Sequence, residues 1–73
     1  MLRLAASNVG RVVRFRLEGV DLGMKLVHVV EDVATELNVE SPVGRALRGA
    51  RVGDSLTVRA PGGNVVVKVL EVN

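Results

Sequence analysis

The chain has to build its core almost without aromatic side chains. Phe15 is its only aromatic residue, whereas 17 of its 73 residues are valine. Valine has a restricted side-chain torsion and suits pleated, half-buried strands. The hydrophobic content of 48% is high enough for one core, and the chain is too short for two. We therefore expect one mostly β domain with an aliphatic core over residues 9–73. A lead segment over 1–8, in which Leu2 and Leu4 could pair weakly with a sheet edge, precedes it.

Composition narrows the possible classes of function. The chain has no cysteine, so it has neither a thiolate metal site nor a cysteine nucleophile, and the cytoplasm is the default location. His28 is the single histidine, and its place between apolar residues in a predicted strand favours a structural role over catalysis. No apolar run approaches the roughly 20 residues of a membrane span, and no signal-peptide pattern opens the chain. We expect no cofactor, no metal and no catalytic residue.

Two segments in the first half of the chain have strand patterns. Arg11–Leu17 alternates, with Val13 and Phe15 on one face and arginines on the other. Glu18–Gly23 contains two glycines and is predicted to be a hairpin connection. Met24–Val30 is apolar on both faces, which favours a central strand or one covered by a helix.

The centre of the chain carries a helix signal. Residues 31–37 are predicted to form a loop with a possible turn of helix, and residues 38–40 to be extended. Ser41 is a good N-cap, and Pro42 suits the first helical position because it lacks the amide hydrogen that would be left unpaired there. We predict a two-turn helix over Pro42–Arg48, with Gly49 as a left-handed residue after its end.

The last third of the chain is predicted to be a hairpin. A turn at 52–54 leads into a strand over 55–60, and Pro61–Asn64 has the composition of a tight turn. The apolar residues of Val65–Val72 change face along the segment, which either a β-bulge near Val69–Leu70 or burial on both faces would explain. The fold class is therefore α+β, a small antiparallel β-sheet with one short helix packed on it. An unprotected sheet edge could pair with a second copy, so we expect a monomer or a weak homodimer.

Charge is distributed unevenly around a formal net charge of +2. Most acidic residues lie between positions 18 and 40, and basic residues dominate before and after. Basic residues recur at Arg45, Arg48 and Arg51, which could face phosphate, an acidic partner or solvent. One alternative function is a nucleic-acid accessory module that uses an arginine-rich sheet face. The lack of aromatic side chains for base stacking argues against it. The residues of that face would be Arg11, Arg14 and Arg16 with Arg59 or Lys68.

Four short motifs, taken together, indicate a family. They are Ser41-Pro42-Val43-Gly44-Arg45-Ala46-Leu47-Arg48-Gly49, then Val52-Gly53-Asp54, then a strand, then Ala60-Pro61-Gly62-Gly63. In order and spacing they match the pattern S-P-x-x-x-A-L-x-G, V-G-D, strand, T/A-P-G-G. Over about residues 38–72 the chain thus resembles the C-terminal domain of the bacterial Gre transcription elongation factors. The resemblance implies an FKBP-like fold, a curved antiparallel sheet with a short helix across it.

The resemblance also implies a partner. In Gre factors this domain docks on the coiled-coil tip of the β′ subunit of bacterial RNA polymerase, at the rim of the secondary channel, through an acidic or polar residue followed by Ser-Pro. Those positions are Glu40, Ser41 and Pro42 here, and we include Arg45 on the adjoining helix in the predicted docking set. The resemblance thus implies a polymerase-binding module and not an enzyme. A prolyl isomerase of the same fold type would need an aromatic-lined pocket, which Phe15 alone cannot form.

Three departures from the family pattern carry expectations. The N-terminal helical hairpin of Gre factors, whose acidic tip helps to hold a metal ion at the polymerase active site, has no counterpart in Met1–Gly10, so we expect no stimulation of transcript cleavage. The segment 31–38 is several residues shorter than usual. Glu40 stands where Asp or Asn is common. The last two differences would alter the docking edge.

Overall fold

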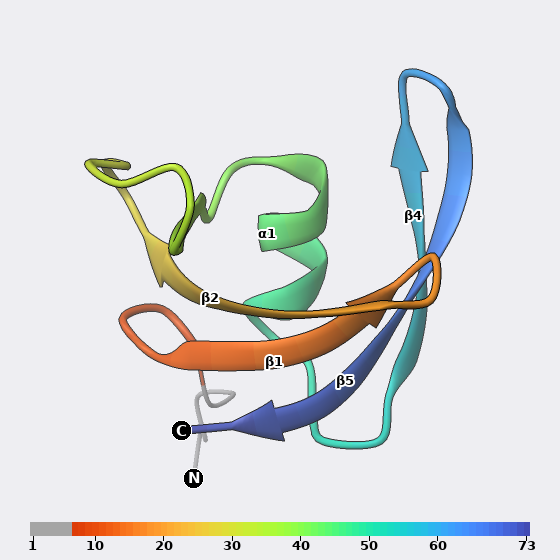
Figure 1. Cartoon of the computed structure of the whole chain (residues 1–73), viewed down its shortest axis with the longest axis horizontal. Helices are drawn as coiled ribbons and strands as arrows, with labels where there is room; N and C mark the ends of the chain where they lie inside the picture. The colour runs from red at the N-terminus through yellow and green to blue at the C-terminus, as the bar shows by residue number, and fades with distance from the viewer. Residues whose placement is uncertain (1–6) are drawn as a thin grey trace, which may run out of the picture.

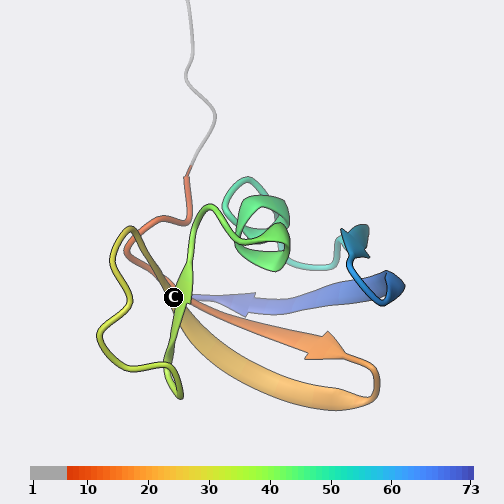
Figure 2. The same ribbon diagram turned by 90° about the horizontal axis from the view of Figure 1, so that it is seen from above.

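The computed structural model describes residues 7–73. Leu2 and Leu4, which we predicted to pair weakly with a sheet edge, lie outside the described residues. Five strands form one sheet in the order β3-β2-β1-β5-β4, and a short helix, α1, packs on it (Figure 1). Seen from above, the sheet is curled and α1 lies on its concave side (Figure 2). The elements are β1 Val12–Leu17, β2 Val20–Val27, β3 Glu36–Asn38, α1 Pro42–Leu47, β4 Ser55–Ala60 and β5 Gly63–Val72.

The predicted fold class is confirmed, with one addition. The four strands that we predicted pair antiparallel, as β2 with β1, β1 with β5 and β5 with β4. The addition is β3, which lies in the segment predicted to be loop and pairs parallel with β2. The sheet is therefore mixed. A three-residue strand has no pattern of its own, because alternation needs four or more residues to show.

The predicted β-bulge lies where the sequence placed it. Val13 and Arg14 of β1 pair with Val72 and Glu71, but Phe15 pairs with Val69, so Leu70 is the extra residue on β5. A bulge shifts the alternation by one position. Val67 and Val69 are buried, and beyond the bulge Val72 returns to pack against the same core. The rival explanation, a strand buried on both faces, is not needed.

The prediction for the second strand was wrong at both ends. It begins at Val20, directly after a two-residue turn in which Glu18 and Gly19 have positive φ angles of 50° and 80°. Positive φ at both central residues is the signature of a type I′ hairpin turn, which matches the twist of the flanking strands. The strand ends at Val27. Beyond it, His28 is exposed and the side chain of Val29 is 75% exposed, so these residues belong to a loop and not to a central strand.

The core is aliphatic, as the composition predicted. It is formed by one face of the sheet, by Leu47 of α1 and by the segments on either side of the helix. The single aromatic side chain, Phe15, is among the buried residues. Burial of each large aliphatic side chain stabilises the fold by about 1.5–3 kcal/mol. The buried hydrophobic residues are Val13, Phe15, Leu26, Val39, Leu47, Ala50, Val58, Val67 and Val69.

Candidate functional site

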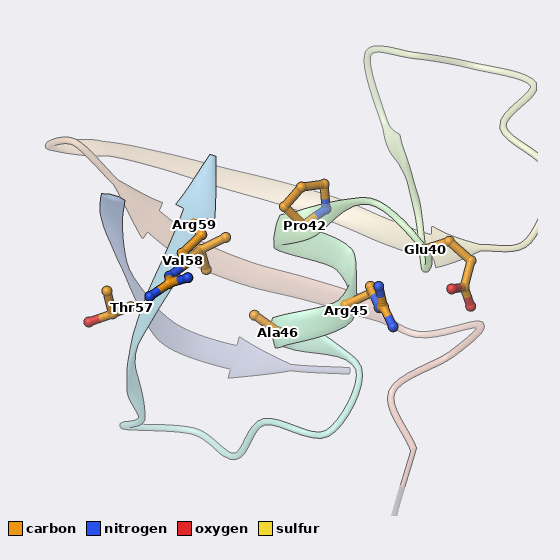
Figure 3. A pocket seen from close by; sticks show the side chains of 7 residues that line it. All are labelled: Glu40, Pro42, Arg45, Ala46, Thr57, Val58 and Arg59. Carbon is orange, nitrogen blue, oxygen red and sulfur yellow. The ribbon is translucent and has the colours of Figure 1, made fainter. Parts of the chain in front are cut away.

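The helix and the edge strand β4 enclose an open groove of about 340 Å³ (Figure 3). It brings together three of the four residues that the sequence predicted for docking, namely Glu40, Pro42 and Arg45. Ser41 does not line the groove and is half-buried. The lining residues are Glu40, Pro42, Arg45 and Ala46 from the helix and the turn before it, and Thr57, Val58 and Arg59 from β4.

Ser41 fixes the start of the helix. Its Oγ accepts a hydrogen bond from the amide of Gly44 at 3.1 Å and donates one to the carbonyl oxygen of Asn38 at 2.7 Å. The first bond satisfies an amide that would otherwise be unpaired at the helix N-terminus. The N-cap at Ser41 and the start at Pro42 are therefore confirmed. Because its hydroxyl is engaged on both sides, Ser41 acts in this structure by positioning its neighbours.

Asn38 completes this corner, and the sequence did not reveal it. Its Oδ1 accepts a hydrogen bond from the amide of Glu40 at 2.7 Å, and its carbonyl oxygen accepts a second bond from the Ser41 amide at 3.0 Å. Asn is common in such side-chain-to-backbone turns. The backbone that carries Glu40 is thus held from both sides. This fixes the direction in which the Glu40 side chain leaves the chain.

Gly44 is required by the same corner. It is buried, and a Cβ at this position would collide with the carbonyl oxygen of Asn38 and lie 2.9 Å from Ser41 Oγ. Glycine inside a short helix is otherwise unfavourable by about 1 kcal/mol relative to alanine. A glycine at an unfavourable helical position was therefore the one sequence signal that two backbone segments approach each other closely here.

Glu40 faces solvent at the end of the groove. Its side chain is 64% exposed, and Oε1 lies 3.0 Å from Nη1 of Arg48. The pair connects the turn before the helix to the residue that caps its C-terminal end. An exposed ion pair of this kind contributes little to stability, but it offsets the charge of Glu40 at the mouth of the groove.

The C-terminal end of α1 differs from the prediction. Gly49 is not left-handed, and Arg48 keeps a right-handed conformation with φ −63° and ψ −23°. The reason is Asn8, which is 7% exposed and donates from Nδ2 to the carbonyl oxygens of Leu47 at 2.7 Å and Ala50 at 2.8 Å. Its backbone amide donates to the carbonyl of Arg48 at 2.8 Å. These bonds satisfy the carbonyls that a left-handed cap would otherwise serve. The sequence pattern of 1–8 gave no signal for this role.

The residues of the alternative nucleic-acid surface do not form one free basic face. Arg14 pairs with Glu71 at 3.4 Å, and Arg16 makes a two-point contact with Asp21 at 2.7 and 3.3 Å. The hydrogen bond from Arg16 lowers the pKa of Asp21, so this carboxylate keeps its charge to lower pH. Lys68 lies opposite Arg16 on β5, whereas Arg59 lines the groove. Two of the five basic side chains are therefore neutralised and one belongs to a different surface.

The loop between β2 and β3 is held by its own hydrogen bonds. The Glu36 carboxylate accepts from the amides of Glu31 at 2.8 Å and Asp32 at 2.9 Å. These bonds, with that from Asp32 the larger influence, lower the pKa of Glu36. The Glu36 amide in turn donates to the carbonyl of Asp32 at 2.9 Å, which closes a hydrogen-bonded turn; the possible turn of helix that we predicted here is not a helix in the structure. Glu31 and Asp32 are exposed, as expected for a solvated loop.

Residues 7–73 contain no cluster of three or more side chains that could coordinate a metal ion. Within the same residues, no helix has the length and apolar character needed to cross a membrane.

The comparisons with known proteins point to one family. Residues 8–73 match the family model of the C-terminal domain of the transcription elongation factors GreA and GreB. A GreA from Rhizobium etli is 45% identical over 40 residues, which are 55% of this chain and 25% of that protein. The structure of GreA factor homolog 1 (Gfh1) from Thermus thermophilus superposes with a TM-score of 0.69 at 28% identity, over 99% of this chain and 53% of that one. A GreA/GreB factor from Nitrosomonas europaea gives a TM-score of 0.68 at 30% identity, over 97% and 64%.

The curled mixed sheet with one capped helix on its concave side defines a small α+β domain of the kind found in these factors. The chain belongs to the GreA/GreB transcription elongation factor family and corresponds to its C-terminal domain. It spans a quarter of the length of the Rhizobium GreA and about half of the Thermus Gfh1 chain.

Proposed function

We propose that this domain docks on bacterial RNA polymerase at the rim of the secondary channel, on the coiled coil of the β′ subunit. It would act there in the cytoplasm as a binding module of a Gre-type regulator. Membership of the Gre family supports the choice of partner. The docking surface we assign to it is the groove between α1 and β4, with Glu40, Pro42 and Arg45 at its helical side and Ser41 holding the backbone of this segment.

One observation carries this assignment. The exposed carboxylate of Glu40, the exposed ring of Pro42 and the Arg45 side chain face one groove, and the hydrogen bonds of Asn38 and Ser41 hold the backbone beneath them. A surface whose backbone is fixed before binding loses less conformational entropy when a partner arrives. The segment that the family likeness selects is therefore also a segment whose backbone is held by local hydrogen bonds.

Binding fits the chemistry of the groove better than catalysis does. Its seven lining residues include no histidine, cysteine or serine, and the one carboxylate, Glu40, pairs with Arg48, so no nucleophile is paired with a base there. They offer two cations, one carboxylate and apolar side chains, which is the composition of a recognition surface. We propose accordingly that the domain acts by occupying a position on the polymerase and not by transforming a substrate.

The proposal is tested by retention of the 73-residue chain on immobilised β′ coiled-coil segment and on core RNA polymerase. The substitution Glu40→Arg removes the carboxylate that the family likeness selects for the contact and breaks its ion pair with Arg48, and it is expected to lower the affinity about tenfold or more. Pro42→Ala removes an exposed contact and is expected to weaken binding to a smaller degree. Glu18→Arg makes the same charge reversal in the β1–β2 turn, outside the groove, and should bind like the unmodified chain.

The unmodified chain failing to bind either target would reject the docking function. Binding that is equal for the unmodified chain, Glu40→Arg and Pro42→Ala would retain the partner but reject this surface.

A further inference from the structure

The groove has a second feature that its docking role does not by itself specify, namely a charge pattern. Pro42, Ala46 and Val58 form its apolar part, while Arg45 of α1 lines it on the side of Glu40 and Arg59 of β4 lines it on the other side (Figure 3). Both arginines are exposed. The groove is also open on one side, because β4 is the last strand of the sheet that residues 7–73 form and pairs there with β5 alone.

Neither arginine has a carboxylate partner within residues 7–73. The ion pairs of these residues engage Arg14, Arg16 and Arg48, and the carboxylate of Glu40 at the groove mouth is the partner of Arg48. Because Glu40 and Arg48 offset each other, the charges of Arg45 and Arg59 remain as a surplus of two positive charges facing one hollow. A partner that brings negative charge to this hollow would offset that surplus.

The local structure gives a reason for a positive charge at Arg45 but none for a positive charge at Arg59. Arg45 lies in the last turn of α1, where a cation is favoured by the helix dipole. Arg59 has no such role. Its cross-strand neighbour on β5 is Asn64, an uncharged residue. The presence of two arginines around one groove, both unpaired within the described residues, is therefore a property of the groove and not of either element alone.

We propose that the groove binds an acidic segment of its partner, with carboxylates on Arg45 and Arg59 and an aliphatic side chain on the apolar part of the groove. Guanidinium groups present several donors in a planar fork that matches a carboxylate, and charge-assisted bonds of this kind give both affinity and orientation. The volume of about 340 Å³ is at the small end of binding pockets, so it suits a few side chains and not a whole helix. The inference rests on the proposed docking function and specifies the chemistry of the partner segment.

The direct test uses peptides in place of the partner. A short fluorescein-labelled peptide of alternating glutamate and leucine is titrated with the 73-residue chain, followed by anisotropy, beside a matched peptide of glutamine and leucine. We expect the acidic peptide to bind and the neutral one not to bind. Arg45→Glu and Arg59→Glu should each lower the affinity for the acidic peptide about tenfold or more at low salt, and added salt should weaken the binding. Arg11→Glu, a charge reversal at an exposed arginine outside the groove, is the matched control and should bind normally.

Equal binding of the acidic and neutral peptides would overturn the inference. So would unchanged binding by Arg45→Glu and Arg59→Glu, or an equal loss in Arg11→Glu. Polymerase retention separates this result from the docking function. If the chain binds polymerase and both groove variants bind it equally well, the acidic-segment inference fails and docking stands. If the acidic peptide binds through both arginines and polymerase is not retained, the groove chemistry stands and the docking function fails.

Discussion

The two ends of helix α1 are held in place by different means. At the N-terminal end, Asn38, Ser41 and Gly44 form a network within seven consecutive residues. At the C-terminal end, the contacts come from Asn8, which is 39 residues away from Leu47 and 42 from Ala50 in the chain. One end is built from neighbours in sequence and the other from a distant segment. The residues on the helix that we propose for docking, Pro42 and Arg45, lie between these two ends.

This difference explains which features of the helix could be read from the sequence. A local cap needs a particular residue type at a fixed spacing, so the Ser-Pro pair gave the correct start of α1. A cap supplied from far away in the chain leaves no such spacing. The predicted left-handed Gly49 was wrong because Asn8 already satisfies the carbonyls at that end.

The largest loss of stability is expected at the N-terminal end of α1, which is held by neighbours in sequence. Gly44→Ala places a methyl group against the Asn38 carbonyl and the Ser41 hydroxyl, and neither can move without breaking the corner. We expect a loss of about 3 kcal/mol in the free energy of unfolding, measured by urea denaturation. Gly49→Ala is the matched control, because open space surrounds that position and its φ is not positive. Equal stability of the two variants would show that the close approach at Gly44 is not needed.

The second-largest loss of stability is expected at the C-terminal end of α1, where the contacts come from the distant residue Asn8. Asn8→Asp keeps the shape of the side chain but replaces the donating amide with a carboxylate that faces two carbonyl oxygens. Loss of the buried donors should lower the free energy of unfolding by about 2 kcal/mol. Asn64→Asp, the same change at an exposed position of β5, should be nearly neutral. If both variants denature at the same urea concentration, the C-terminal end of α1 does not depend on Asn8.

A smaller effect is expected from the N-cap alone. Ser41→Ala removes one capping bond and the bond to Asn38 and should cost about 1 kcal/mol. Ser55→Ala, at an exposed position of β4, is the control. Combining Ser41→Ala with Asn8→Asp tests whether the two ends act independently. If they do, the losses add within about 0.5 kcal/mol, and a clear departure from the sum would mean that the helix responds as one unit.

The smallest effect is a pH dependence that arises away from the helix. Folding lowers the pKa of Glu36, because its carboxylate accepts bonds from the amides of Asp32 and Glu31. Its contribution is complete above the ordinary glutamate pKa of about 4.3 and is lost as the pH falls from there through the lowered folded value. Urea midpoints measured across this range should decline less in Glu36→Gln than in the unmodified chain. Parallel declines would show that the loop bonds do not contribute.

The same contrast between local and distant information holds for the sheet. Alternation identified β1, and the change of face in the last strand identified the bulge at Leu70, because both are periodic features of one segment. The end of β2 was misplaced because Val29 and Val30 have strand composition, while the chain has already turned at His28 and Val27 accepts a bond from the Val39 amide. That bond and the pairing with β3 are made by residues a dozen positions away, and no pattern within 24–30 encodes them.

The candidate site shows the same division. The sequence could predict Glu40, Pro42 and Arg45 as site residues because they belong to one motif on one segment. Arg59 joins them only because pairing with β5 holds β4 at the sheet edge, where it contacts the helix. The charge pattern of the groove is thus a product of topology, and the sequence alone could identify only its helical wall.

The central claim is that the groove between α1 and β4 is where the domain meets polymerase. The most direct measurement is a titration of the ¹⁵N-labelled 73-residue chain with the β′ coiled-coil segment, followed by amide chemical shifts. We expect the shift changes to concentrate at Glu40, Arg45, Ala46 and Thr57–Arg59. Changes confined to Arg14, Arg16 and Lys68 on the outer face of the sheet, with the groove residues unmoved, would contradict the account.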